Sequence, residues 1–148
     1  MHYYCETDDN QLVSIHRGKD GPVIATASQC LEKEGVTDIH FALPKFTICL
    51  EHSHRYLPFF QGVHTFTFNG KKYQWKGHTA LIDADSGVLL AALHTRFLES
   101  DPHKLGTLVI TLDGKDILDM AVITCLVMQE RSEEGRRSVQ TRRFSFGR

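Results

Sequence analysis

The stretch "DILDMAVITCLVMQE", residues 116–130, decides the fold of this protein. Between Ile117 and Met128 only Asp119 and Thr124 are polar, so an element built from this stretch has no solvent face. An element that is apolar on every side has to be enclosed by the rest of the chain. As a helix its apolar part spans roughly 18 Å at about 1.5 Å per residue, which is close to the height of a small β-barrel.

We expect this stretch to form a helix over about 116–131. Its β-branched residues also suit a strand, but the run contains no Gly, no Pro and no turn signal, and its length favours a helix. Asp113 or Asp116 is the expected N-cap, and Gly135 is a plausible end.

Most of the preceding chain consists of short segments with alternating apolar residues, separated by turn residues. The clearest is a hairpin around Asn69-Gly70, a pair that suits the positive φ angles of a type I′ turn. The fold class predicted is mostly β: an antiparallel closed β-barrel of about 10–12 short strands around one central apolar C-terminal helix. The strand segments are expected within 11–17, 22–30, 37–43, 45–51, 62–77, 78–94 and 104–114.

The length indicates one domain, residues 1–134, followed by a basic tail, residues 135–148. The formal net charge is -1, but six Arg and two Glu fall within residues 131–148. The tail is therefore basic and the rest of the chain acidic, which permits an anionic partner. The segment 138–148 alternates well enough for a late strand, with Val139, Phe144 and Phe146 as candidates for burial.

The order of these segments resembles the tubby C-terminal-like fold, which tubby proteins, phospholipid scramblases and plant LURP-one-related proteins share. The closer resemblance is to small fungal proteins of that group. The stretches that carry the resemblance are "DDNQLVSIHRGKDGPVIATAS" (8–28), "FNGKKYQWKG" (68–77), "LIDADSGVLLAAL" (81–93) and "LGTLVITLDGKDILDMAVITCLVMQER" (105–131).

The resemblance implies a binding protein rather than an enzyme, because tubby domains bind phosphoinositide headgroups through basic surface residues. No tubby lipid-binding position aligns with a particular residue here. We expect peripheral recognition of an anionic lipid headgroup or a phosphate ligand by cations of this chain. The candidate cations are Lys71, Lys72, Lys76, Arg136, Arg137, Arg142 and Arg143.

The expected location is the cytoplasm, with peripheral contact to a membrane. The N-terminal residues lack a secretory pattern, and the longest apolar run is shorter than the about 20 residues that cross a bilayer. We expect no cofactor, and the glycine loops that bind nucleotide phosphates are absent from the sequence. We also expect no nucleic-acid partner.

Two alternatives remain open. His52 and His54 would share one face of a strand, which suits two ligands of a divalent metal and would point to a metal-dependent enzyme. A third ligand would come from His64, His78, His94, His103 or Glu51. The aromatic segment 55–62, with Tyr56, Phe59 and Phe60, would instead suit a protein–protein interface.

The cysteines and serines give no signature of nucleophilic catalysis. There is no GxSxG motif and no CxxC pair in the sequence. Cys49 and Cys125 lie in apolar runs, so both are expected to be reduced, buried and unreactive.

Overall fold

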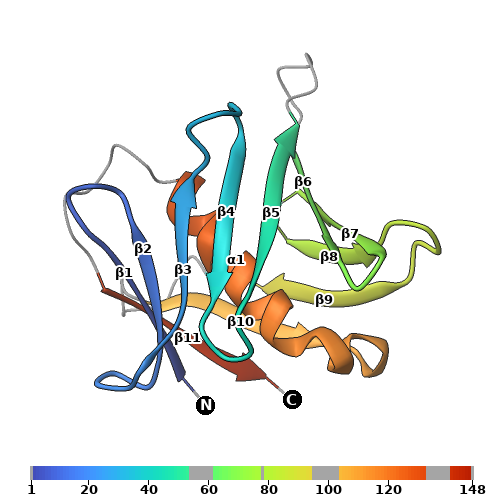
Figure 1. Ribbon diagram of the computed structural model, residues 1–148. Coiled ribbons are helices and arrows are strands. Elements are labelled where there is room, and N and C mark those ends of the chain that lie inside the picture. The colour runs from blue at the N-terminus through green and yellow to red at the C-terminus, as the bar shows by residue number, and fades with distance from the viewer. Residues whose placement is uncertain (1, 54–61, 78, 95–103, 133–140, 148) are drawn as a thin grey trace.

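The computed structural model describes residues 2–53, 62–77, 79–94, 104–132 and 141–147, and for 2, 104–106, 131–132 and 141–147 it describes the backbone alone. These residues form one β-sheet and a single C-terminal α-helix (Figure 1). The strands are β1 (His2–Thr7), β2 (Val13–Arg17), β3 (Val23–Gln29), β4 (Val36–Phe41), β5 (Phe46–Ser53), β6 (Val63–Phe68), β7 (Lys71–Lys76), β8 (Ala80–Asp83), β9 (Leu89–His94), β10 (Lys104–Ile110) and β11 (Thr141–Gly147). The predicted mostly β class with one C-terminal helix is confirmed.

The sheet follows the chain order from β1 to β10, each strand antiparallel to the next along the sequence wherever the two pair. The late strand β11 lies between β1 and β10, antiparallel to the first and parallel to the second. The hydrogen-bonded order therefore runs β1-β11-β10-β9-β8-β7-β6-β5-β4-β3-β2, and β2 pairs with β1.

The predicted antiparallel closed barrel is corrected in two places. One is the parallel β10–β11 pair, whose register is irregular. The other lies between β5 and β6, which pair only from Glu51–Thr65 to Ser53–Val63 and then diverge (Figure 1). Beyond this point the rings of Phe46 and Phe68 pack 5.3 Å apart between the two strands. Side-chain packing here replaces a continuous ladder of backbone hydrogen bonds.

The apolar stretch of the sequence forms the central helix. A 3₁₀ helix η1 (Leu112–Ile117) leads into α1 (Leu118–Ser132), and every side chain from Met120 to Met128 is buried. The inward side chains of the strands join these residues in one core, as a helix without a solvent face requires. The expected N-cap is wrong, because Thr111 occupies the cap position of η1 and no side chain makes a cap hydrogen bond there.

Several finer expectations can be compared with the strands. Asn69 and Gly70 have φ angles of 49° and 75°, as the hairpin turn between β6 and β7 requires. The sequence pattern does not predict β1, because acidic residues lie at its end and directly after it. The predicted late strand exists as β11. Of the three candidates for burial, Val139 lies outside the described residues, and only the backbone of Phe144 and Phe146 is described.

The two cysteines of the apolar runs differ in their burial. Cys125 is buried in α1 as expected, but Cys49 is exposed, so its predicted burial is wrong. Ile48 and Leu50 point into the core on either side of it, and alternation along β5 turns Cys49 outward. All four cysteines are free thiols.

Asp119, an acid at the start of the buried helix, lies at its exposed end. Its carboxylate is 3.4 Å from a guanidinium nitrogen of Arg17, and the two side chains are 51% and 46% exposed. Exposed ion pairs contribute at most about 1 kcal/mol. We therefore predict that Arg17→Ala lowers the free energy of unfolding by less than about 1 kcal/mol. Urea denaturation at low and high salt measures this loss, and a much larger loss would show that Arg17 acts through packing on Tyr3, whose ring centre lies 5.8 Å away.

Candidate functional site

Two histidines meet where β5 and β6 are still paired. His52, near the end of β5, lies opposite His64, near the start of β6. Their rings stack with centres 4.2 Å apart and planes 5° from parallel. His64 is 6% exposed and His52 is half-buried, so the pair is held inside the wall of the sheet and is not a feature of the outer surface.

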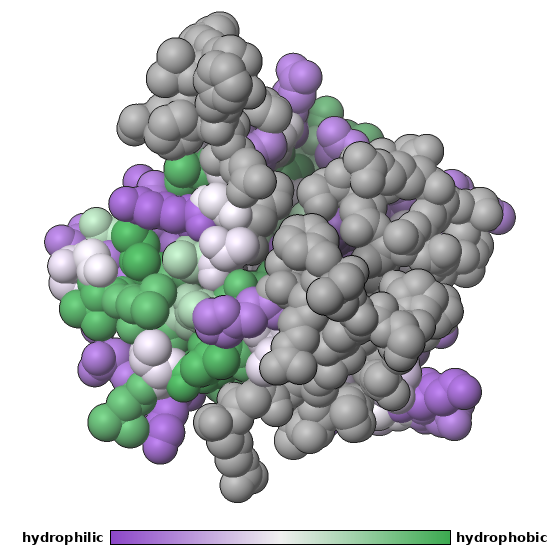
Figure 2. Space-filling view, turned by 180° about the vertical axis from the view of Figure 1, so that it is seen from behind, coloured by the Kyte–Doolittle hydropathy of each residue, from purple (hydrophilic) through white to green (hydrophobic). Residues whose placement is uncertain are grey.

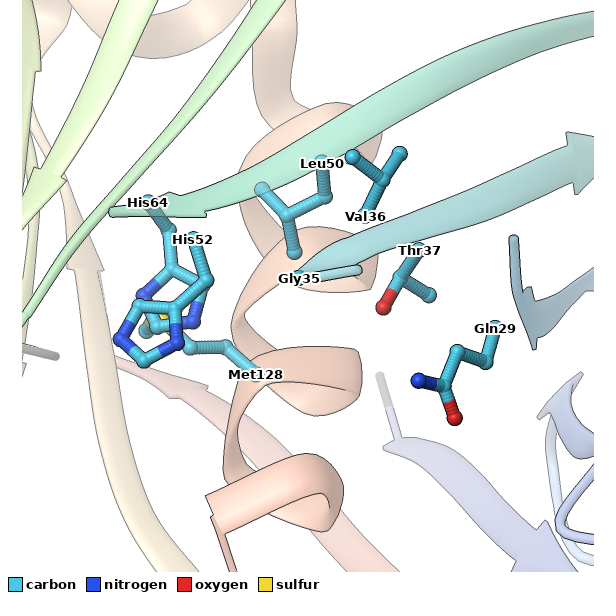
Figure 3. A pocket seen from close by; sticks show the side chains of 8 residues that line it. All are labelled: Gln29, Gly35, Val36, Thr37, Leu50, His52, His64 and Met128. Atoms are coloured by element: carbon cyan, nitrogen blue, oxygen red, sulfur yellow. The ribbon is translucent and has the colours of Figure 1, made fainter. Parts of the chain in front are cut away.

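The histidine pair lines a cavity of about 150 Å³ (Figure 3). Polar groups come from Gln29 and Thr37, at the adjacent ends of β3 and β4, and Met128 of α1 extends to the rings from the centre of the molecule. Within the described part of the chain, no carboxylate lines this cavity. The lining residues are Gln29, Gly35, Val36, Thr37, Leu50, His52, His64 and Met128.

Two glycines allow His52 its position. The backbone N–H of His52 donates a hydrogen bond of 2.8 Å to the carbonyl oxygen of Gly35, whose φ of 76° favours glycine. A Cβ on Gly62 would overlap the imidazole Nε2 of His52. A larger residue at position 62 would therefore displace the ring from the cavity.

A wider cleft of about 420 Å³ adjoins the cavity and shares Gly35, Val36 and His52 with it. Its other lining residues are Lys33, Glu34, Glu51, Ser53 and Thr65. The cleft carries charges of both signs, whereas the ionisable groups among the described residues of the cavity are the two imidazoles.

The predicted metal site receives no support from the described residues. His54 lies outside them, so the predicted His52–His54 pair stays a prediction. His52 stacks on His64, one of the residues proposed as a third ligand, but among the described residues no group of three His, Cys, Asp or Glu side chains is arranged to hold a metal ion. The local sequence does not reveal the cross-strand register that pairs His52 with His64. The HxH spacing predicted a partner at His54 instead.

The candidate cations divide between two regions. Lys71, Lys72 and Lys76 are all exposed on β7, where Lys72 and Lys76 share the outer face. Lys71 lies close enough to Asp83 to contribute to lowering the pKa of that carboxyl, after the backbone N–H groups of Asp85 and Ser86. Arg136 and Arg137 lie outside the described residues, and Arg142 and Arg143 are in β11, where the backbone alone is described.

The predicted aromatic interface of Tyr56, Phe59 and Phe60 lies outside the described residues. No helix among the described residues has the length and apolar character needed to cross a bilayer.

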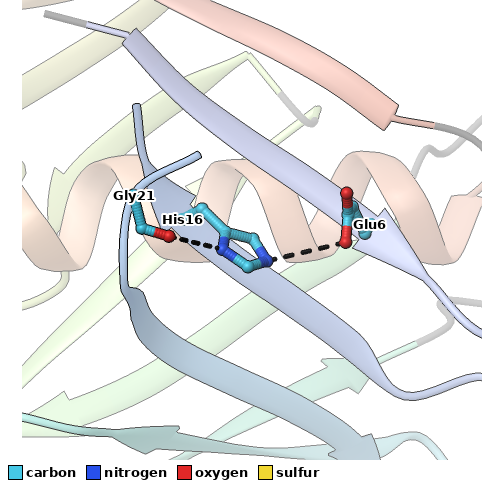
Figure 4. Close-up of polar contacts among 3 residues, drawn as sticks. All are labelled: Glu6, His16 and Gly21. Carbon is cyan, nitrogen blue, oxygen red and sulfur yellow. Dashed lines mark hydrogen bonds and ion pairs between the residues drawn. The ribbon is translucent and has the colours of Figure 1, made fainter. Parts of the chain in front are cut away.

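A third histidine, His16, has a structural role (Figure 4). Its Nδ1 lies 3.0 Å from the carbonyl oxygen of Gly21, and its Nε2 lies 3.6 Å from a carboxylate oxygen of Glu6. Since a carbonyl only accepts, Nδ1 carries the hydrogen and donates it. The ring thus joins β1 and the β2–β3 turn, and it lines neither the cavity nor the cleft.

The thiols of Cys125 and Cys49 do not resemble activated nucleophiles. Burial raises the pKa of the Cys125 thiol far above its usual range. Partial burial, together with a hydrogen bond of 3.3 Å to Asp38, raises the pKa of the Cys49 thiol. A raised pKa keeps a thiol protonated at neutral pH, and the protonated form is a poor nucleophile.

Comparison with known proteins gives a family without a function. No curated protein matched the chain, and no solved structure matched it. The resemblance to the tubby-like group therefore stays a prediction. The model of the Family of unknown function (DUF6593) matches residues 1–134, which include β1 to β10 and the whole of α1. The chain therefore belongs to this family of unknown function.

Proposed function

We propose that this protein is a non-enzymatic binding protein whose histidine cavity takes one anionic group, a phosphate or a carboxylate, of a small molecule or a lipid headgroup. The observation that carries the proposal is the stacked pair of His52 and His64 in a cavity with no described carboxylate. The pairing of β5 with β6 holds these two side chains against each other.

The chemistry of stacked imidazoles favours an anion. A protonated imidazole donates through both ring nitrogens, and it gains its proton mostly below about pH 6.5. At a separation of 4.2 Å, charge on one ring opposes charge on the other. An anion bound beside them removes this repulsion, so binding and protonation support each other.

The size of the cavity limits what enters it. A volume of about 150 Å³ holds a single phosphate or carboxylate group, and it is smaller than the roughly 300–1,000 Å³ of pockets that enclose a drug-sized ligand. The side-chain amide of Gln29 and the hydroxyl of Thr37 supply further donors. The remainder of a larger ligand would lie in the adjoining cleft, near Lys33 and Ser53.

Titration with sulfate tests the proposal, because sulfate keeps its charge across the pH range in which histidine titrates. We expect calorimetry to give about tenfold tighter binding at about pH 5.5 than at about pH 7.5. His52→Gln should weaken binding at the lower pH by about tenfold or more and reduce the pH dependence. The matched control is His94→Gln, since His94 is an exposed histidine at the end of β9 and does not line the cavity.

Equal weakening by the two histidine substitutions, or sulfate binding that does not change with pH, would contradict the proposal. In a nuclear magnetic resonance titration, the backbone signals that shift should be those of residues 35–37, 52 and 64. Shifts confined to β7 would place the anion at the lysines instead.

The anionic group could belong to a small molecule or to a lipid headgroup. Comparing the binding of inorganic phosphate with the binding of vesicles distinguishes these two sources. Vesicles containing phosphatidylserine or a phosphoinositide represent the headgroup, and phosphatidylcholine vesicles are the neutral control. We propose peripheral contact through Lys72 and Lys76, supported by their shared outer face on β7. In that case Lys72→Glu with Lys76→Glu should abolish flotation with anionic vesicles and leave sulfate binding at the histidines unchanged.

A further inference from the structure

An exposed apolar surface lies on the side of the molecule that carries β8, β9 and η1. Figure 2 shows hydrophobic residues gathered on this side, with hydrophilic residues around them. Val88, Leu89 and Leu112 are its large exposed residues, and Leu112 is 78% exposed. We call these three residues the apolar patch.

Hydrogen bonds bring the three residues of the patch together. The hydroxyl of Thr111, next to Leu112, donates to the carbonyl oxygens of Leu89 and Leu90 at 2.8 and 3.1 Å. The backbone N–H of Thr111 also donates to Leu90 at 2.9 Å. The start of η1 is thus fixed beside the start of β9. Single exposed leucines are common in proteins, but several that are held side by side mark an interaction surface.

Acidic residues surround the apolar patch. The backbone N–H of Asp83 donates to the carbonyl oxygen of Val88 at 3.0 Å, and the N–H of Asp85 donates to the carboxylate of Asp83 at 2.9 Å. On the other side, Asp113 and Asp116 belong to η1 and are both exposed.

Tyr73 shows that the two acidic groups lie near one another. Tyr73 pairs with Asp83 across β7 and β8, and its pKa is raised first by burial and then by the charges of Asp83 and Asp116. The described cations near these acids are Lys71, Lys72 and Lys115, against the four acids Asp83, Asp85, Asp113 and Asp116. The rim therefore keeps an excess of negative charge.

We infer that the apolar patch binds a segment of a partner protein in which apolar residues are flanked by lysine or arginine. Apolar side chains of the segment would cover Leu112 and Leu89, and its cations would meet the acidic rim. The charge of the rim opposes an anionic membrane or a nucleic acid at this surface. The patch lies beside η1, before the start of α1, whereas the histidine cavity reaches Met128 near the other end of that helix. The inference is therefore independent of the proposed anion site.

Fluorescence anisotropy with the full chain tests this inference. The probe is a labelled amphipathic peptide of about 16 residues made of leucine and lysine. Two matched peptides replace its lysines by glutamate or its leucines by serine. We expect only the leucine–lysine peptide to bind, with an affinity that falls as salt is raised.

Substitutions locate the binding surface. Leu112→Ser should raise the Kd by about tenfold or more, and Asp113→Asn with Asp116→Asn should raise it and reduce the salt dependence. Leu31→Ser is the control, since Leu31 is fully exposed and lies outside the patch. Circular dichroism confirms that each variant is folded.

Three outcomes would overturn the inference. The first is no measurable binding of the leucine–lysine peptide, or equal binding of the leucine–glutamate peptide. The second is equal weakening by Leu31→Ser and Leu112→Ser. The third is a wild-type dimer in sedimentation velocity that Leu112→Ser converts to a monomer, which would make a second copy of the chain the occupant.

Discussion

Replacing Trp75 with alanine is expected to lower the free energy of unfolding by about 3–5 kcal/mol. Trp75 is fully buried near the end of β7, where its side chain packs in the core that encloses α1. Its indole Nε1 donates a hydrogen bond of 2.8 Å to the hydroxyl of Thr124, which donates in turn to the carbonyl oxygen of Met120 at 2.6 Å. The substitution removes a large buried side chain together with a buried hydrogen bond between the sheet and the helix. Chemical denaturation followed by circular dichroism measures the loss.

Smaller substitutions separate packing from hydrogen bonding in this contact. Thr124→Val keeps the volume of the side chain but leaves the indole N–H without its acceptor, at a cost of about 1–3 kcal/mol. Trp75→Phe removes the donor as well as part of the ring, so a double-mutant cycle isolates the hydrogen bond. Lys76→Ala, an exposed neighbour on the same strand, should stay within about 0.5 kcal/mol of the wild type. A loss for Trp75→Ala as small as that of the control would show that β7 does not hold the helix in place.

Replacing Gly114 with alanine is expected to destabilise the protein by about 1–3 kcal/mol. In an exposed helix the same change is usually stabilising by up to about 1 kcal/mol, because alanine has the higher helix propensity. Gly114 is buried in η1, and a Cβ placed on it would overlap the carbonyl oxygen of Leu90 in β9. That oxygen also accepts from Thr111, so the backbone of β9 cannot move away without losing a hydrogen bond.

The comparison with Lys115→Ala makes this prediction specific. Lys115 is the next residue in η1, and it is exposed, so its replacement should have little effect. Thermal and urea unfolding of the two variants compare the positions directly. A stabilised Gly114→Ala variant would mean that η1 lies farther from β9 than it does in this structure.

Much of the fold could be predicted from the sequence because its signals are local. The apolar stretch 116–130 has a length and composition that favour an enclosed helix, and every side chain from Met120 to Met128 is indeed buried. Asn69-Gly70 specifies its turn through the φ angles that these residues tolerate, and the alternating segments specify β2 to β9. Each of these properties depends on neighbours along the chain.

Strand β1 and Cys49 show where local signals fail. Tyr3 and Cys5 alternate into the core, but the acids that follow them hide the pattern. Cys49 lies in an apolar run, yet the pleat of β5 turns it outward. In both cases the direction of a side chain follows from which strands pair.

The candidate site was decided by tertiary structure for the same reason. The histidine spacing in "EHSHR" suggested two ligands on one strand, but His52 meets His64 through the register of β5 and β6. The apolar patch forms because η1 returns beside β9, a contact between residues about twenty positions apart. The sequence by itself determined that this chain buries one helix inside a β-sheet, since composition and periodicity are local properties of the chain. Only the tertiary structure decided which side chains meet, because strand register and the approach of distant backbones arise from packing the whole core at once.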